Sequence, residues 1–155
     1  MGHVFWQGRP AQPNVLQQLP ISLTIKMGAT EVNYPFQNTD SSGFFTVTAS
    51  LADGLYNWRV KNPKYLANGG TLTLARGSVT QVEMGTMRAG DCNNDNVVNS
   101  QDFIILKNAY GKQVGEPGYD DRANFNGDTV VSSQDFNAMR INFGQGGPPP
   151  LGSRQ

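Results

Sequence analysis

The sequence contains one cysteine, Cys92, and one histidine, His3, among its 155 residues. A single cysteine excludes an internal disulfide framework. The two residues together provide too few ligands for a zinc site built from His and Cys. No apolar run approaches the roughly 18 residues that a membrane-spanning helix needs, so we expect no membrane insertion.

The chain also has no net charge, because 12 Lys and Arg residues balance 12 Asp and Glu residues. It therefore lacks the broad basic field that non-specific nucleic-acid binding requires, and we expect no nucleic-acid partner. We find no nucleophile–base pair, no phosphate-binding loop and no metal site of catalytic geometry. We therefore expect neither enzymatic activity nor a small-molecule substrate.

Turn-forming residues are plentiful, with 18 Gly and 9 Pro, whereas charged residues make up only 15%. Such a composition is typical of turn-dense β structure rather than of a helical bundle. Residues 21–25 and 55–61 alternate between apolar and polar side chains, as half-buried strands do. Comparable short runs begin at Val4, Phe44, Thr71 and Val79. For residues 1–88 we therefore expect an all-β, Ig-like antiparallel sandwich of about seven strands.

Aromatic residues in this first segment follow the strand period. Tyr56, Trp58 and Val60 are spaced two apart and so lie on one strand face, which predicts a core stripe rather than a sugar-stacking platform. The order of "TDSSGFF", "DGLYNWRVK" and "YLANGG" resembles the carboxypeptidase-regulatory or prealbumin-like sandwich. This resemblance implies a scaffold or spacer of extracellular multi-domain proteins and brings no catalytic residues.

Charge divides the chain near Gly90. Residues 1–89 carry seven basic and four acidic side chains, a net +3, whereas residues 90–146 carry four basic and eight acidic side chains, a net −4. The second segment therefore gathers carboxylates, which indicates a cation-binding task.

A twelve-residue, oxygen-rich loop opens the second segment. Calcium takes 6–8 oxygen ligands, and loops of this length supply them from positions 1, 3, 5, 7, 9 and 12. Position 6 is Asn96, which tolerates the left-handed conformation that the turn needs. The predicted ligands are Asp91, Asn93, Asp95, the Val97 carbonyl, Asn99 and Asp102.

The same pattern returns 33 residues later, and nine of the 21 positions in spans 91–111 and 124–144 are identical. An internal repeat is much harder to obtain by chance than a single loop match. The second set of predicted ligands is Asn124, Asn126, Asp128, the Val130 carbonyl, Ser132 and Asp135. The sequence thus predicts two Ca²⁺ sites.

Two departures predict that the second site is the weaker one. Asn124 replaces an aspartate at position 1, which leaves two carboxylates against three in the first loop, and ligand charge tunes loop affinity. Position 6 is Thr129, a β-branched residue for which we expect a strained, positive φ.

A short helix is expected after each loop. Phe103, Leu106 and Tyr110 form one apolar stripe, and residues 136, 139 and 143 form the equivalent stripe of the second helix. Gly111 and Gly144 stand where C-terminal stops belong. We expect the two stripes to pack on each other as a small core.

The strings "GDCNNDNVVNSQDFIILKNAYG" and "ANFNGDTVVSSQDFNAMRINFG" resemble a dockerin module, and we assign it residues 89–146. Both show an Asp at position 12, no entering helix and an apolar exit helix. The resemblance implies calcium-dependent folding and docking to a cohesin domain, in an extracellular or cell-surface setting. Dockerins make that contact from loop positions 10 and 11 and from the helix. The matching residues are Ser100, Gln101, Lys107, Ser133, Gln134 and Arg140.

Residues 147–155 form a Pro- and Gly-rich tail, which is typical of a linker or polyproline-type extension. Loose tails seldom order alone, so a neighbouring chain is expected to hold an ordered one. This leaves two functional hypotheses open. In the first, a sandwich and a dockerin anchor a larger protein to a cohesin partner. In the second, the chain is a structural subunit that binds copies of itself in a homopolymeric filament or surface layer.

Overall fold

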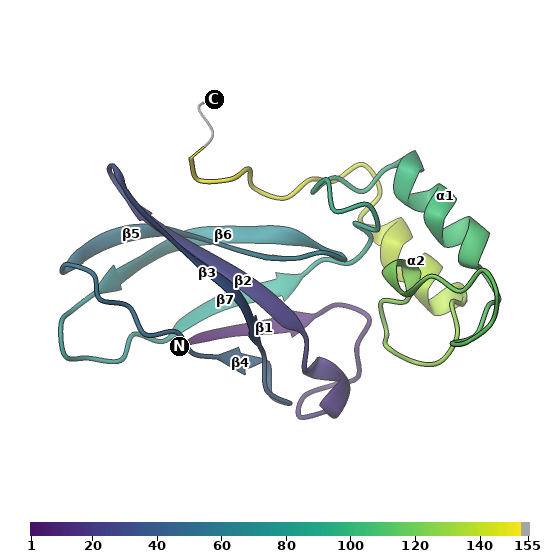
Figure 1. The fold of residues 1–155 in the computed structure, drawn as a ribbon, viewed down its shortest axis with the longest axis horizontal. Helices are drawn as coiled ribbons and strands as arrows, with labels where there is room; N and C mark the ends of the chain where they lie inside the picture. The colour runs from purple at the N-terminus through teal and green to yellow at the C-terminus, as the bar shows by residue number, and fades with distance from the viewer. Residues whose placement is uncertain (153–155) are drawn as a thin grey trace.

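The computed structural model describes residues 1–152, so the last three residues of the predicted tail lie outside the described part. Its strands form two sheets that face each other, with two helices beyond one end of the sheets (Figure 1). The strands are β1 (Gly2–Trp6), β2 (Pro20–Met27), β3 (Thr30–Asn38), β4 (Phe44–Phe45), β5 (Gly54–Asn62), β6 (Tyr65–Leu74) and β7 (Val82–Met87).

One sheet has the order β4–β1–β7 and the other has the order β3–β2–β5–β6. The expectation of a purely antiparallel sandwich is wrong at one pair, because β1 and β7 pair in parallel. Both strands run toward the helical segment, where the chain after β1 bonds to the chain after β7. The Gln7 amide donates to the carbonyl of Met87, and the Gln7 side chain accepts hydrogen bonds from the Ala89 amide and from Asn142.

Strand alternation places apolar side chains between the sheets. In β5 the side chains of Tyr56, Trp58 and Val60 are buried, which confirms the predicted core stripe. The sequence reading missed β3, whose residues are mostly exposed and which lies at the edge of its sheet. An exposed edge strand lacks the apolar alternation that reveals a half-buried one.

Two helices follow the sandwich, α1 (Ser100–Ala109) and α2 (Ser133–Ile141), and the single-turn 3-10 helices are η1 (Val15–Gln17) and η2 (Asp121–Ala123). Gly111 and Gly144 follow α1 and α2 with φ of 77° and 81°, which confirms the predicted stops. None of the helices in residues 1–152 combines the length and the apolar character needed to cross a membrane.

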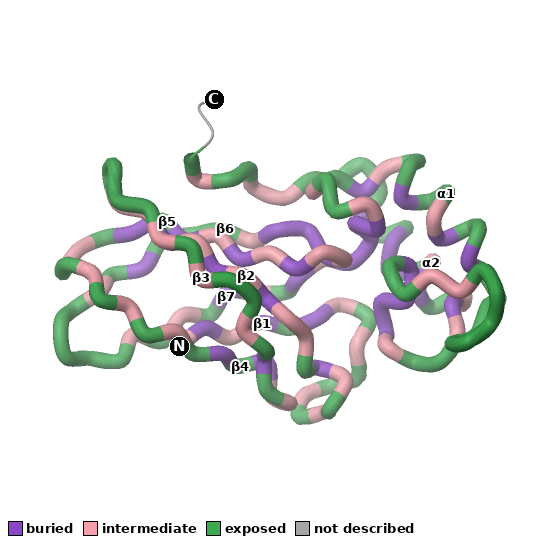
Figure 2. Tube along the Cα trace, in the orientation of Figure 1, coloured by how far each residue is buried: buried purple, intermediate pink, exposed green. Residues whose placement is uncertain are grey.

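A single buried apolar cluster extends from the sandwich into the helical segment. Figure 2 shows buried residues in both parts of the trace. Tyr65 and Met87 from the strands, Phe125 from the second loop, and Leu106 and Met139 from the helices all belong to it. The charge boundary near Gly90 is therefore not a boundary in the core.

The described part of the tail is bonded to its own chain. The Gly147 amide donates to the Asn96 carbonyl, and the Asn96 side chain donates to the carbonyls of Gly147 and Pro148. Arg59 of β5 donates to the Pro148 carbonyl over 2.9 Å. Figure 1 shows the tail passing along β6 and β5.

Candidate metal-binding loops and docking surface

The first loop, residues 91–102, is organised by its own polar side chains. Asn93 Oδ1 accepts a hydrogen bond from the Asp95 amide, and Asp95 Oδ1 accepts one from the Val97 amide. Asn93 Nδ2 donates to Asp95 Oδ2 and to Gln101 Oε1. Positions 3, 5 and 7 are thereby drawn into one turn.

The second loop, residues 124–135, repeats these bonds at the equivalent positions. Asn126 Oδ1 accepts from the Asp128 amide, and Asp128 Oδ1 accepts from the Val130 amide. Asn126 Nδ2 donates to Asp128 Oδ2 and to Gln134 Oε1. The sequence repeat is thus a structural repeat as well.

Positions 9 and 12 of each loop close onto the following helix. Asn99 and Ser132 are the N-caps of α1 and α2, and each shares a capping box with the aspartate at position 12. Both Asp102 and Asp135 are fully buried and accept loop amide hydrogens on both carboxylate oxygens. The predicted position-9 ligands therefore also start the helices.

Backbone conformation confirms one prediction for position 6 and overturns the other. Asn96 adopts a φ of 70°, as expected, and Asn94 at position 4 adopts 62°. In the second loop, Gly127 at position 4 takes the positive φ, 78°, whereas Thr129 does not. The expected strain at Thr129 is therefore wrong, because a glycine carries the left-handed turn without steric cost.

Position 1 of the first loop fits a cation. The Asp91 side chain is fully buried; its Oδ2 accepts from the Asn96 amide and forms an ion pair of 2.8 Å with Lys61. Its Oδ1 is the one buried side-chain oxygen or nitrogen in residues 1–152 without a hydrogen-bond partner. Burial raises the pKa of Asp91, and the Lys61 ammonium works against that rise. A buried carboxylate oxygen with an open coordination position is what a metal ligand requires.

Carboxylates alone do not complete either site. No group of three or more His, Cys, Asp or Glu side chains in the described chain is arranged to hold a metal. The other oxygen groups at the predicted ligand positions are the amides of Asn93, Asn99, Asn124 and Asn126, the Ser132 hydroxyl and the carbonyls of Val97 and Val130. These are the donor types that calcium accepts.

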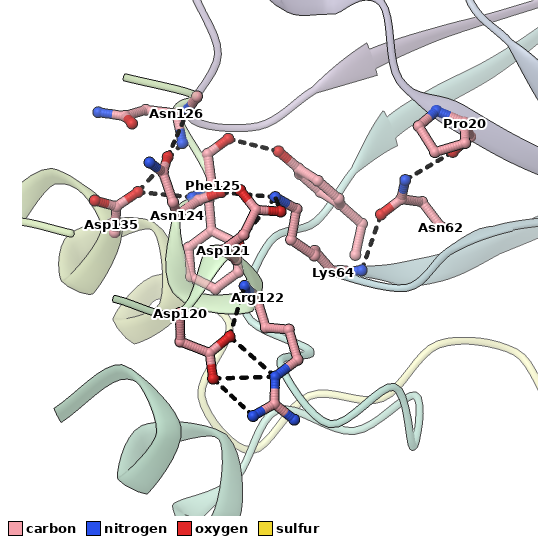
Figure 3. A network of polar contacts seen from close by, with 12 residues as sticks. Pro20, Asn62, Lys64, Asp120, Asp121, Arg122, Asn124, Phe125, Asn126 and Asp135 are labelled. Atoms are coloured by element: carbon pink, nitrogen blue, oxygen red, sulfur yellow. Dashed lines mark hydrogen bonds and ion pairs between the residues drawn. The ribbon is translucent and has the colours of Figure 1, made fainter. Parts of the chain in front are cut away.

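Position 1 of the second loop is an amide that is already engaged. Asn124 is buried, its Oδ1 accepts from the Gly127 amide, and its Nδ2 donates to the Tyr119 hydroxyl and the Asp128 carbonyl. Figure 3 shows Asn124 beside Asn126 and Asp135. These hydrogen bonds fix the Asn124 side chain within the loop.

Sequence reasoning missed the β5–β6 hairpin, which contacts both loops. Lys61 Nζ bonds to Asp91, whereas Lys64 Nζ donates to Asp121 Oδ2 and to the backbone carbonyls of Asp121 and Asn124 (Figure 3). Burial lowers the pKa of Lys61, and Asp91 opposes that effect. These lysines lie about 30 to 60 residues from the loops in sequence, and no motif marks them.

All six predicted partner contacts are exposed: Ser100, Gln101, Lys107, Ser133, Gln134 and Arg140. Equivalent residues therefore stand at equivalent places on α1 and α2. The apolar stripe of each helix is only partly buried. Leu106 and Met139 are buried, whereas Tyr110 and Phe143 are about half exposed. Only part of each stripe builds the core, and the rest adds apolar surface to the helices.

Cys92 at position 2 of the first loop is buried, and burial raises the pKa of its thiol. A buried thiol with a raised pKa is poorly nucleophilic.

Comparison with known proteins supports the repeat and the overall fold. Residues 89–142 match the family described as the dockerin type I domain, which confirms the resemblance of this segment. No curated protein matches the chain in sequence. Two solved structures from Acetivibrio cellulolyticus, both described as type II cohesin–X–dockerin complexes, contain chains similar in fold.

The first of these structures is a C-terminal interface mutant, and its similar chain is 21% identical with a TM-score of 0.66. The second is an N-terminal interface mutant, with 17% identity and a TM-score of 0.64. In both cases 94% of this chain and 94% of the other chain are covered. The likeness therefore concerns the fold of the strands and the helices together.

Proposed function

We propose that this chain is a non-enzymatic, extracellular or cell-surface assembly module that docks a larger protein onto a cohesin-type domain. The main support for this proposal is the duplicated loop–helix unit, because residues 89–142 match the dockerin type I domain. The fold likeness to chains of cohesin–X–dockerin complexes, over 94% of this chain, supports the same function. In this proposal the strands form an Ig-like or prealbumin-like spacer that carries the docking segment.

Calcium is the proposed cofactor of both loops. In the first loop the ligands would be the side-chain oxygens of Asp91, Asn93, Asp95, Asn99 and Asp102 with the Val97 carbonyl. In the second they would be those of Asn124, Asn126, Asp128, Ser132 and Asp135 with the Val130 carbonyl. The open Oδ1 of Asp91 supports the first set. A bound divalent cation would offset the mutual repulsion of these carboxylates and so stabilise the fold.

The docking surface would lie on the exposed helix starts and on the outer helix faces. On α1 the docking surface would comprise Ser100, Gln101 and Lys107. On α2 it would comprise Ser133, Gln134 and Arg140. Gln101 and Gln134 each accept a hydrogen bond from the position-3 asparagine of their loop. Calcium binding would therefore fix residues of the contact surface.

The contacts of the tail favour docking over the homopolymer hypothesis. That hypothesis rested on a tail held by a neighbouring copy, whereas the described tail bonds to Asn96 and Arg59 of its own chain. Docking to a cohesin-type partner is therefore the function favoured here.

Titration of the whole chain against a panel of cohesin domains tests the proposal, with calcium and again with a chelator. We expect calcium-dependent binding to at least one cohesin. Ser100→Ala with Gln101→Ala should weaken that binding only modestly, because α2 presents the equivalent surface. Substituting both pairs should abolish it. Absence of binding to every cohesin, or binding that survives chelation unchanged, would contradict the proposal.

A further inference from the structure

The β5–β6 hairpin places one lysine ammonium against the first loop. Lys61 Nζ lies 2.8 Å from Asp91 Oδ2 and donates to Asn94 Oδ1 over 2.7 Å. It also donates to the carbonyls of Asn62 and Tyr65, which belong to the hairpin itself. The Lys61 side chain is only 12% exposed. The sandwich therefore holds this cation in place, independently of any bound metal.

The sandwich places a cation beside the carboxylates of the first loop. The first loop contributes Asp91, Asp95 and Asp102, and the second contributes Asp128 and Asp135. Lys61 places one positive charge in direct contact with Asp91 of the first loop. Lys64 of the same hairpin contacts Asp121 and backbone carbonyls and none of the expected carboxylate ligands, and the Arg9 guanidinium lies against Gly127 of the second loop.

We propose that Lys61 is a tethered counter-cation of the first loop, supplied by the sandwich, that lowers the calcium affinity of this loop. The inference rests on the proposed binding of calcium by both loops. Without calcium, Lys61 neutralises part of the charge around Asp91 and keeps the loop folded. With calcium, the same ammonium repels the divalent ion across a poorly solvated site.

The geometry distinguishes repulsion of calcium by Lys61 from mere orientation of the Asp91 carboxylate. Asp91 Oδ2 is held by two donors, Lys61 and the Asn96 amide, whereas Oδ1 remains open. Loss of Lys61 leaves the Asn96 amide to orient the carboxylate. An outer partner that only orients a ligand strengthens metal binding, so its removal weakens affinity. Removal of a charge that repels calcium should instead raise the calcium affinity.

Calorimetric calcium titration of Lys61→Met tests the inference, in a chain where Asp128→Asn has weakened the second site. The matched control is Lys64→Met on the same hairpin. We expect Lys61→Met to bind calcium about tenfold more tightly, because one unit of repulsion is removed. Lys64→Met should bind as its parent does. Lys61→Gln, which keeps a hydrogen-bond donor but no charge, should behave like Lys61→Met.

Thermal unfolding in chelator provides the second readout. Lys61→Met should melt below its parent without calcium, and the gap should shrink or reverse when calcium is added. Unchanged or weaker calcium binding in both Lys61 variants would overturn the inference while the proposed function stands. A parent chain that binds no calcium at all would overturn both.

Discussion

The hydroxyl of Tyr65 donates a hydrogen bond of 2.7 Å to the backbone carbonyl of Phe125, and both residues are fully buried. Tyr65 begins β6, whereas Phe125 is position 2 of the second loop. The two rings also meet edge to face, with centroids 6.3 Å apart. One tyrosine therefore joins the sandwich to the repeat through both a polar and an apolar contact.

Tyr65→Phe should destabilise the whole chain. The substitution keeps the ring but leaves the Phe125 carbonyl buried without this donor, which costs about 1–3 kcal/mol. Denaturant unfolding measures the change. Tyr110→Phe is the matched control, because Tyr110 is half exposed and should shift the unfolding free energy little. Equal effects of the two substitutions would contradict a buried, structural hydroxyl.

Chelation should lower the melting temperature of the strands and the helices together. The apolar cluster is continuous across the charge boundary near Gly90, so changes in the loops are transmitted to the packing of the sandwich. At free calcium about 100 times the dissociation constant, each site adds about 2.7 kcal/mol. Tryptophan fluorescence reports the sandwich, and helical circular dichroism reports the repeat. Two separated transitions in chelator would show that the modules unfold independently.

Asn124→Asp should tighten the second calcium site and destabilise the calcium-free chain. The aspartate adds a carboxylate at position 1 but loses the donor that bonds to the Tyr119 hydroxyl and the Asp128 carbonyl. Calcium titration and unfolding in chelator measure the two effects. Asn137→Asp on the exposed face of α2 is the control for added charge. Because Thr129 has no positive φ, Thr129→Gly should bring no further gain in affinity.

Gly147→Ala should loosen the tail. A Cβ on Gly147 would lie 2.5 Å from Asn96 Oδ1 and 2.7 Å from the backbone of Ala67, which cannot move without disturbing β6. Overpacking of this kind costs about 1–3 kcal/mol. Gly146→Ala is a neighbouring control, since its Cβ meets only ordinary contacts of 3.4 Å or more. Limited proteolysis and thermal unfolding should distinguish the two variants.

Local sequence patterns were sufficient to predict the two loops of the repeat and the helices that follow them. The spacing of Asp95, Asn99 and Asp102 predicts a loop that closes on a helix, because the side chains that build it bond to amides a few residues away. The same local logic identifies the strand alternation of β2 and β5 and the glycines that end α1 and α2. It failed at β3, where an exposed edge strand carries no apolar period.

Tertiary structure decided what no local pattern encodes. The parallel pairing of β1 with β7, the attachment of the tail to Asn96, and the approach of Lys61 to Asp91 all join residues far apart in the chain. Such contacts depend on how whole elements pack, because burial and charge neutralisation are satisfied between surfaces and not along the sequence. The sequence by itself determined two repeated polar loops and the helices that follow them, whereas packing decided that the buried ammonium of Lys61 lies against Asp91 of the first loop.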